Sequence, residues 1–233
     1  ECSGTLGASL SGFAIDFPLL SDPGVILLML AGQDADLVVI DLPTLTVSAS
    51  VELKVVVWTP PTIFVKVGGS FQMDIDIDFG YDTRGINTYM ITGLPEDIAD
   101  GFYIIVRDPD TNERKPQLTL SITVNVGAGV SIGIAELGVG GGITGTAYFY
   151  LHDPDNDGKV RWKEMAEVAE ANGWIFDVRV KIEVFFNIYL TLDFGLFSFD
   201  IFNFEVRINV YDKTFNIQLP PRLGTVVPTT GGY

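Results

Sequence analysis

Apolar and polar residues alternate with a period of two along most of the chain, the pattern of β-strands with one face buried and one face in water. The longest such run extends from Phe176 to Phe194 and would span about 60 Å at ~3.3 Å per residue. Shorter runs extend from Phe71 to Tyr81 and from Leu118 to Val126, and a strand is predicted from Thr146 to Leu151. Because typical strands have about 5–6 residues, the pattern predicts elongated sheets.

Interruptions of this alternation predict the remaining elements. The apolar phase shifts by one residue between Ile201 and Phe202, which predicts a β-bulge and a bend. The short apolar run from Val25 to Ala31 is far below the ~20 residues of a membrane-spanning helix and is predicted as a buried strand. A helical turn is expected at Pro95 to Asp100, and a longer helix from Arg161 to Asn172 that ends at Gly173.

These elements predict an all-β fold of elongated antiparallel sheets, sandwich-like, with one inserted loop and one short helix. A length of 233 residues fits one large β domain, which we place at residues 1–219. Residues 220–233 are rich in Pro, Gly and Thr and are expected to form a connector to a neighbouring module. The chain begins at Glu1 without a signal-peptide pattern, which favours a piece of a longer polypeptide.

The net negative charge of the chain excludes some kinds of binding partner. With 14 basic and 30 acidic residues the formal net charge is -16, so nucleic acid would be repelled. Such a surface also repels anionic lipid and attracts divalent cations, which favours an extracellular or cell-surface location where calcium is abundant. Cys2 is the single cysteine, so no internal disulfide can stabilise the fold.

The segment HDPDNDGKVRWKEM, residues 152–165, carries the strongest chemical signal. Its spacing matches D-x-[DN]-x-[DN]-G-x5-E, in which alternate carboxylates point inward, a glycine permits a sharp turn and a final glutamate gives two oxygens. The glycine is Gly158, and Met165 belongs to the apolar face of the helix that follows. The pattern predicts a Ca²⁺ site whose ligands are the side chains of four acidic residues and one backbone carbonyl: Asp153, Asp155, Asp157, Glu164 and the carbonyl of Lys159.

This loop resembles those of EF-hand proteins and dockerins. A predicted strand replaces the usual incoming helix and there is no second loop, so the resemblance implies a structural calcium site rather than a sensor or a cohesin-binding dockerin. The longer stretch GGITGTAYFYLHDPDNDGKVRWKE, followed by alternating strands, resembles segments of very large secreted bacterial calcium-binding surface proteins.

Three weaker motifs have two interpretations each. Asp108 to Glu113 begins like a second calcium loop but lacks the glycine, so a polar hairpin turn is favoured. Asp74, Asp76 and Asp78 could hold a cation, although a solvated face paired with Lys or Arg is favoured. Gly140 to Gly145 matches G-x-G-x-x-G, but a strand rather than a helix follows, which argues against a dinucleotide site.

Together these features predict a calcium-stabilised, non-catalytic structural module of an extracellular surface, fibre or matrix protein. An enzyme is not expected, because His152 is the only histidine, so no His-based catalytic triad or multi-histidine zinc site can be assembled. The expected partners are neighbouring modules or copies of the same chain, and membrane contact is not expected. The alternative is a hydrophobic-ligand carrier or a membrane-associated β-structure, which the aromatic residues between Phe185 and Phe204 would suit.

Overall fold

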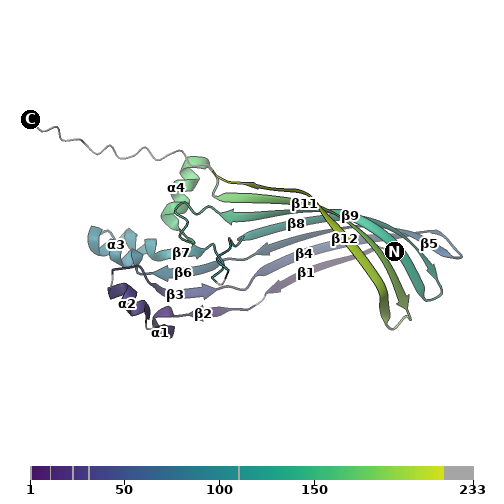
Figure 1. The fold of residues 1–233 in the computed structure, drawn as a ribbon, viewed down its shortest axis with the longest axis horizontal. Coiled ribbons are helices and arrows are strands. Elements are labelled where there is room, and N and C mark those ends of the chain that lie inside the picture. The colour runs from purple at the N-terminus through teal and green to yellow at the C-terminus, as the bar shows by residue number, and fades with distance from the viewer. Residues whose placement is uncertain (1, 11, 23, 31, 110, 218–233) are drawn as a thin grey trace, which may run out of the picture.

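The computed structural model describes residues 2–217 except residues 11, 23, 31 and 110, and its main feature is a long antiparallel sheet (Figure 1). The seven strands lie in the order β1-β4-β5-β8-β9-β11-β12. The last of these, β12, forms one edge of the sheet, and β1 forms the other. Their bounds are Cys2–Leu10 (β1), Leu45–Trp58 (β4), Thr62–Ile75 (β5), Leu118–Ile132 (β8), Ala135–Leu151 (β9), Phe176–Asp193 (β11) and Ser198–Phe215 (β12).

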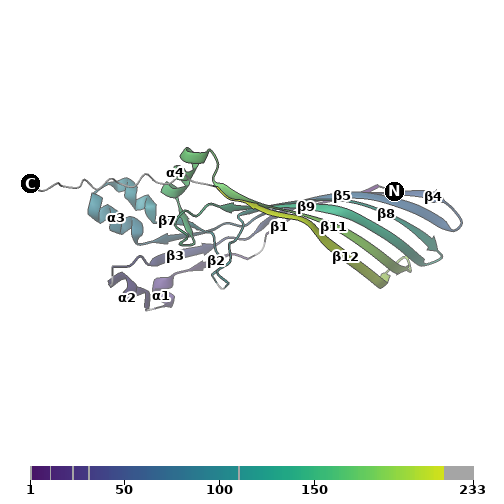
Figure 2. The same ribbon diagram turned by 45° about the horizontal axis from the view of Figure 1, so that its top comes forward.

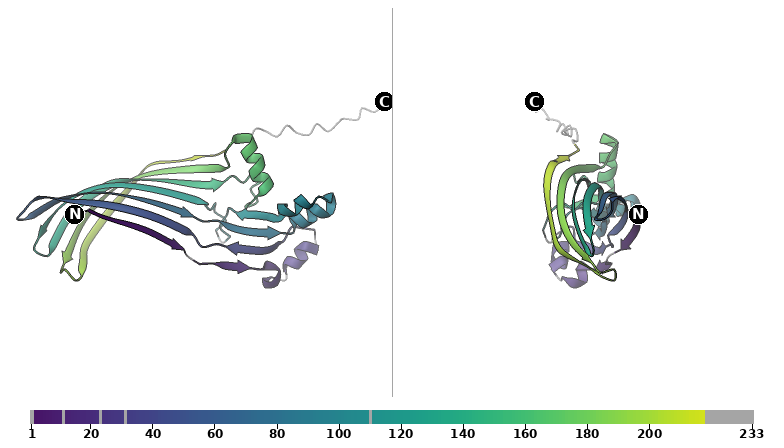
Figure 3. Two further views of the ribbon diagram at one scale, coloured as in Figure 1. Left: turned by 180° about the vertical axis from the view of Figure 1, so that it is seen from behind. Right: turned by 90° about the vertical axis from the view of Figure 1, so that its right-hand side faces the viewer.

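A smaller five-stranded sheet lies at one end of the long sheet, in the order β10-β7-β6-β3-β2 (Figures 1 and 2). Its strands are Ala14–Asp16 (β2), Asp36–Asp41 (β3), Asp78–Asp82 (β6), Phe102–Ile105 (β7) and Lys159–Arg161 (β10). The helices gather at this end, which we call the head, and the long sheet twists and curves away from it (Figure 3). The predicted all-β, sandwich-like class with elongated antiparallel sheets is therefore confirmed, while the predicted connector, residues 220–233, lies outside the described residues.

Two of the helices were predicted from the sequence, and a third lies where a strand was predicted. Those predicted at Pro95 and Arg161 are present as a 3₁₀ helix and as α4, which ends at Gly173 with a φ of 68°. The predicted strand from Val25 to Ala31 is wrong, because residues 25–30 belong to helix α2. The Asp22 carboxylate accepts a hydrogen bond from the N–H of Gly24 at the start of this helix (2.8 Å). The helix bounds are Pro18–Ser21 (α1), Gly24–Leu30 (α2), Arg84–Thr92 (α3), Pro95–Gly101 (η1) and Trp162–Asn172 (α4).

The predicted strand runs differ from the structure at one place. The alternation from Phe71 to Tyr81 is not one strand, because β5 ends at Ile75 in the long sheet and β6 begins at Asp78 in the small sheet. The side-chain period is the same in both sheets, so the pattern itself gives no sign of the change. By contrast, the bulge predicted near Ile201 is confirmed, since the pairing with β11 skips this residue, and a second bulge skips Val210.

The strand register gives the long sheet one apolar and one polar face. One row across β4, β5, β8, β9, β11 and β12 reads Val51, Gly69, Val124, Ile143, Val184 and Ile208. The neighbouring row on the opposite face reads Ser50, Ser70, Thr123, Thr144, Glu183 and Asn209. The apolar face is not covered within the described chain, since Val124 keeps 60% and Ile143 keeps 54% of its surface exposed.

The packed core lies in the head instead, where the two sheets meet. Val106, Leu151 and Val160 are at most 4% exposed and form one cluster. Met165 from α4 packs against this cluster, and so does Phe176 at the start of β11. The helix after the acidic loop is therefore docked on the sheets by its apolar side, as the sequence predicted.

Candidate metal centre

The acidic loop lies on the connection between the two sheets. The chain leaves the long sheet at Leu151, the end of β9, and enters the small sheet at Lys159, the start of β10. It then forms α4 and returns to the long sheet at Phe176. Leu151 and Val160, on either side of the loop, are both buried in the core, so the loop is held at both ends.

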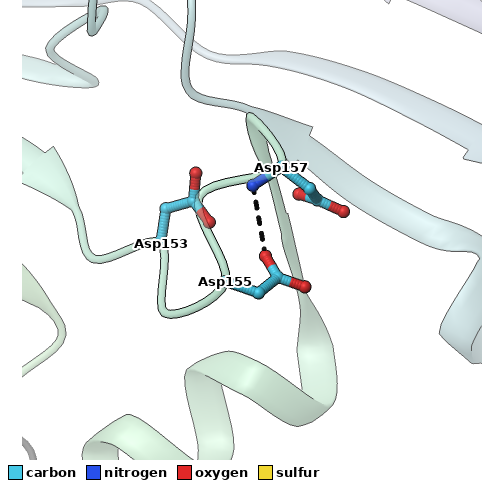
Figure 4. Close-up of side chains that lie close together, drawn as sticks. All are labelled: Asp153, Asp155 and Asp157. Atoms are coloured by element: carbon cyan, nitrogen blue, oxygen red, sulfur yellow. Dashed lines mark hydrogen bonds between the residues drawn. The ribbon is translucent and has the colours of Figure 1, made fainter.

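Hydrogen bonds from the backbone to aspartate side chains give the loop its shape, and Figure 4 draws the one between Asp155 and Asp157. Asp153 accepts two of them, from the N–H of Asn156 (2.8 Å) and from the N–H of Gly158 (3.0 Å). Asp155 accepts one from the N–H of Asp157 (3.3 Å). Asn156 and Gly158 have positive φ angles of 61° and 86°, which asparagine and glycine tolerate best. The sequence therefore folds this segment into a tight turn around its own carboxylates.

Three of the predicted ligands are brought together. One carboxylate oxygen each of Asp153, Asp155 and Asp157 lies within 4.8 Å of the others. Asp153 is buried, and its burial raises the pKa of its carboxyl, as do the neighbouring Asp155 and Asp157, while the backbone N–H groups act in the opposite direction. A cation among the three oxygens would offset this crowding of negative charge. The cluster could therefore hold a metal ion.

The fourth predicted carboxylate, Glu164, lies in the first turn of α4. Its Oε2 accepts a hydrogen bond from the N–H of Arg161 (2.9 Å), so it caps the helix, and burial is the main cause of its raised pKa. Glu164 and Asp155 both line a hollow of about 410 Å³. Among the residues that the structure describes, the cluster of mutually close oxygens contains only the three aspartates, so Glu164 stays a predicted ligand.

The last predicted ligand residue, Lys159, opens β10. Its N–H donates to Oδ1 of Asp157 (2.8 Å), and its ammonium group pairs with Asp36 and Asp82 in the small sheet. The role predicted for its carbonyl oxygen stays a prediction. The lysine side chain nevertheless links the loop to strand β3, which lies far away in the sequence.

Arg161 is the functional side chain that sequence reasoning missed. Its guanidinium is 3% exposed and lies 2.8 Å both from Oδ2 of the fully buried Asp82 and from Oδ2 of Asp157. Burial alone would lower the pKa of Arg161, but the two carboxylates outweigh it and raise that pKa. The loop is thus joined by a buried ion pair to the end of β6, and no sequence signal connects Arg161 with Asp82.

A second buried carboxylate anchors the other side of the loop. Asp177, at 2% exposed, accepts hydrogen bonds from Nη2 of Arg114 (2.8 Å) and from the N–H of Ile217 (2.7 Å). It also lies 3.1 Å from Nδ1 of His152, the residue before the acidic loop. Burial opposes ionisation, yet these donors lower the pKa of Asp177 overall. His152 therefore has a contact of its own beside the loop rather than a place among the carboxylates.

The weaker candidates have structural roles. Asp108 accepts a hydrogen bond from the N–H of Thr111 (2.8 Å), and the backbones of the flanking Arg107 and Arg114 pair as an antiparallel β-bridge, as in a polar turn; Asp110 lies outside the described residues. Asp76 and Asp78 pair with Lys115. Asp74 accepts a hydrogen bond from Thr46 (2.7 Å). The glycines from 140 to 145 lie within strand β9, so no helix begins there.

Comparison with protein-family models, with curated proteins and with solved structures finds no match to this chain. Among the helices of the described residues, none is long and apolar enough to cross a membrane.

Proposed function

We propose that this chain is a calcium-stabilised, non-catalytic structural module of an extracellular or cell-surface protein. One observation carries the proposal: the acidic cluster lies on the connection between the two sheets, so an ion bound there would tie the head to the long sheet. Binding to the folded chain alone would then stabilise the whole fold.

The donors favour calcium among the common metal ions. All the proposed ligands are oxygens, which suits a hard cation, whereas zinc and copper sites use His or Cys. Calcium binds oxygen at about 2.3–2.6 Å, so two oxygens on opposite sides of one ion are about 5 Å apart. The aspartate oxygens lie within 4.8 Å of one another, which is compatible with contact to a single calcium ion. Glu164 and the carbonyl of Lys159 would complete the coordination shell.

The proposed role as a module is supported by the edges of the long sheet. Strands β1 and β12 each have one unpaired edge within the described chain, and every residue of β12 is exposed. Such edges can pair with another strand. Neighbouring modules or copies of the same chain are therefore the proposed partners.

A thermal unfolding experiment tests the calcium proposal. For a Kd near 10⁻⁴ M, as in extracellular modules, 10 mM Ca²⁺ stabilises the fold by about 2.7 kcal/mol. For a chain of this size that raises Tm by roughly 5–11 °C relative to the same chain in EDTA. Glu164→Gln should abolish most of this rise. Glu170→Gln on the exposed side of the same helix is the matched control and should keep it.

Two results would contradict the proposal. A melting curve that is the same in calcium and in EDTA would show that no stabilising ion binds. A calcium-dependent rise that survives in a chain with both Asp153→Asn and Glu164→Gln would place the ion elsewhere.

A further inference from the structure

Three hairpin turns at the end of the long sheet far from the head have an unusual composition. They join β4 to β5, β8 to β9 and β11 to β12. The register places them at one level, since Thr62 pairs with Ser131, and Ala135 pairs with both Ile132 and Leu192. Figure 1 shows the three turns together at this end. Hairpin turns in water are usually rich in Asn, Asp, Gly and Ser.

Large apolar side chains lie in two of these turns and beside all three. Ile134, Phe194, Leu196 and Phe197 lie in the turns, whereas Val57, Trp58, Ile132 and Phe199 are strand residues next to them, and the turn from β4 to β5 is Thr59-Pro60-Pro61. Leu196 is 95% exposed, Ile132 65% and Trp58 63%, so they are not covered by other parts of the described chain. We call the set the tip surface, and its members are Val57, Trp58, Ile132, Ile134, Phe194, Leu196, Phe197 and Phe199. From Val55 to Val65, from Val124 to Ala135 and from Phe194 to Phe199 the sequence has no charged residue.

Contacts within the turn from β11 to β12, and one hydrogen bond from this hairpin to the turn from β8 to β9, hold part of the tip surface in place. Phe194, Phe197 and Phe199 form a cluster of rings with centroids 5.2–6.3 Å apart. The N–H of Asp193 donates to the carbonyl of Ile134 (2.7 Å), which joins two of the turns. These three phenylalanine rings are thus already arranged in the free chain, so binding would not need to order them.

We propose that the tip surface inserts shallowly into a bilayer of zwitterionic lipid. A second copy packed on the apolar face would cover Ile132 and Phe199, which the register places on that face, but not Ile134 and Leu196, which lie in the turns beyond the strand ends. A bilayer met end-on covers the turns together. Aromatic side chains are favoured at the bilayer interface, and the net charge of -16 opposes anionic lipid, which leaves zwitterionic headgroups.

The insertion is limited to the turns for a physical reason. The unpaired edges of β1 and β12 present backbone groups that would lack hydrogen bonds in hydrocarbon. On the polar face, Glu136 binds Lys54 and Lys66 close behind the turns, at 2.9 and 3.1 Å. The exposed Asp193 lies two residues nearer the turn than Thr191, which pairs with Glu136, so water must begin at the level of Asp193.

This proposal differs from the expectation from sequence that the chain makes no membrane contact. In the described chain the aromatic residues of the tip surface are exposed, with Phe197 at 56% and Phe199 at 55%. The proposal concerns the end of the molecule opposite to the acidic loop and does not depend on calcium.

Flotation of the full chain with phosphatidylcholine vesicles tests the inference. We expect the unmodified chain to float with the vesicles and Leu196→Ser/Phe197→Ser to bind at least tenfold more weakly. The matched control is Met90→Ser/Ile91→Ser on α3 in the head, since these side chains are 76% and 86% exposed. That variant should bind as the unmodified chain does. Should the double tip variant fail to fold by circular dichroism, Leu196→Ser alone serves, because this side chain is 95% exposed.

A second measurement reports the orientation. Brominated phosphatidylcholine should quench part of the tryptophan emission, and this part should disappear in Trp58→Phe but persist in Trp162→Phe, since Trp162 belongs to the head. Failure of the unmodified chain to bind vesicles overturns the proposal, as does an equal loss of binding in the tip and head variants. If the tip substitutions abolish self-association in gel filtration and vesicles bind no form of the chain, a second copy occupies the tips and the lipid proposal is wrong.

Discussion

Replacing Arg161 by methionine should destabilise the fold strongly, because it leaves the Asp82 carboxylate buried without its closest cation. The Asp82 side chain is 0% exposed, and removing one partner of a buried ion pair costs about 3–5 kcal/mol. Lys159 stays 3.5 Å from the same carboxylate oxygen and compensates in part, so we expect a loss near the lower bound, about 3 kcal/mol. This is a large share of the ~5–15 kcal/mol by which domains are stable.

Equilibrium unfolding in urea, followed by circular dichroism and fluorescence, measures the loss. Arg207→Met is the control, since Arg207 pairs with Glu205 on the exposed strand β12, and such a pair contributes about 0–1 kcal/mol. The double variant Arg161→Met/Asp82→Asn also lacks the buried negative charge, while the asparagine keeps an oxygen that can accept the hydrogen bond from the N–H of Arg84. This variant should therefore recover most of the stability that Arg161→Met loses. The reasoning would be refuted if Arg161→Met lost no more stability than Arg207→Met. It would also be refuted if the stability loss of the double variant equalled the sum of the losses of Arg161→Met and Asp82→Asn.

Two further predictions concern the long sheet. Gly129→Ala should lower the free energy of unfolding in urea by about 1–3 kcal/mol, because the added methyl group would lie 2.4 Å from the ring of Phe64. Gly145→Ala is the control and should not show this loss, because no atom lies within 4 Å of the position of its methyl group. For Glu136, burial would raise the pKa, but hydrogen bonds from Lys54, Tyr189 and Lys66 outweigh it and lower the pKa from 4.5 to about 2. Its contribution to stability is therefore complete above pH 4.5 and is lost as the pH falls toward 2. Urea midpoints from pH 6 to pH 2 should fall more steeply for the unmodified chain than for Glu136→Gln; parallel curves would contradict this pKa.

The strands and the acidic turn could be predicted from sequence because each depends on neighbouring residues. Period-two alternation gave β8 and β11, and the loss of phase at Ile201 gave a bulge. The turn around Asp153 is built from hydrogen bonds between residues at most five positions apart. Gly173 ends α4 through its left-handed conformation, which is also a local property.

The features that could not be predicted from the sequence depend on contacts between distant residues or on sequence patterns without a period. The run from Val25 to Ala31 is apolar on all sides, so periodicity could not separate helix from strand. The change of sheet between Ile75 and Asp78 leaves the alternation unbroken. The pair of Arg161 and Asp82 joins residues 79 positions apart, and its burial follows only from the fold.

The fold separates two kinds of surface along one sheet. The acidic cluster and the buried ion pairs lie in the head, while the uncharged turns lie at the other end of strands of 14–18 residues, about 45–60 Å away. That distance exceeds the Debye length of ~8 Å at physiological salt, so charge changes in the head are screened from the tips. Calcium should therefore change Tm without changing vesicle binding at temperatures where the chain is folded. Substitutions in the tip surface should instead weaken vesicle binding without changing the rise in Tm caused by calcium. A chain in which EDTA released the bound vesicles while the fold stayed intact would require a coupling that this architecture does not provide.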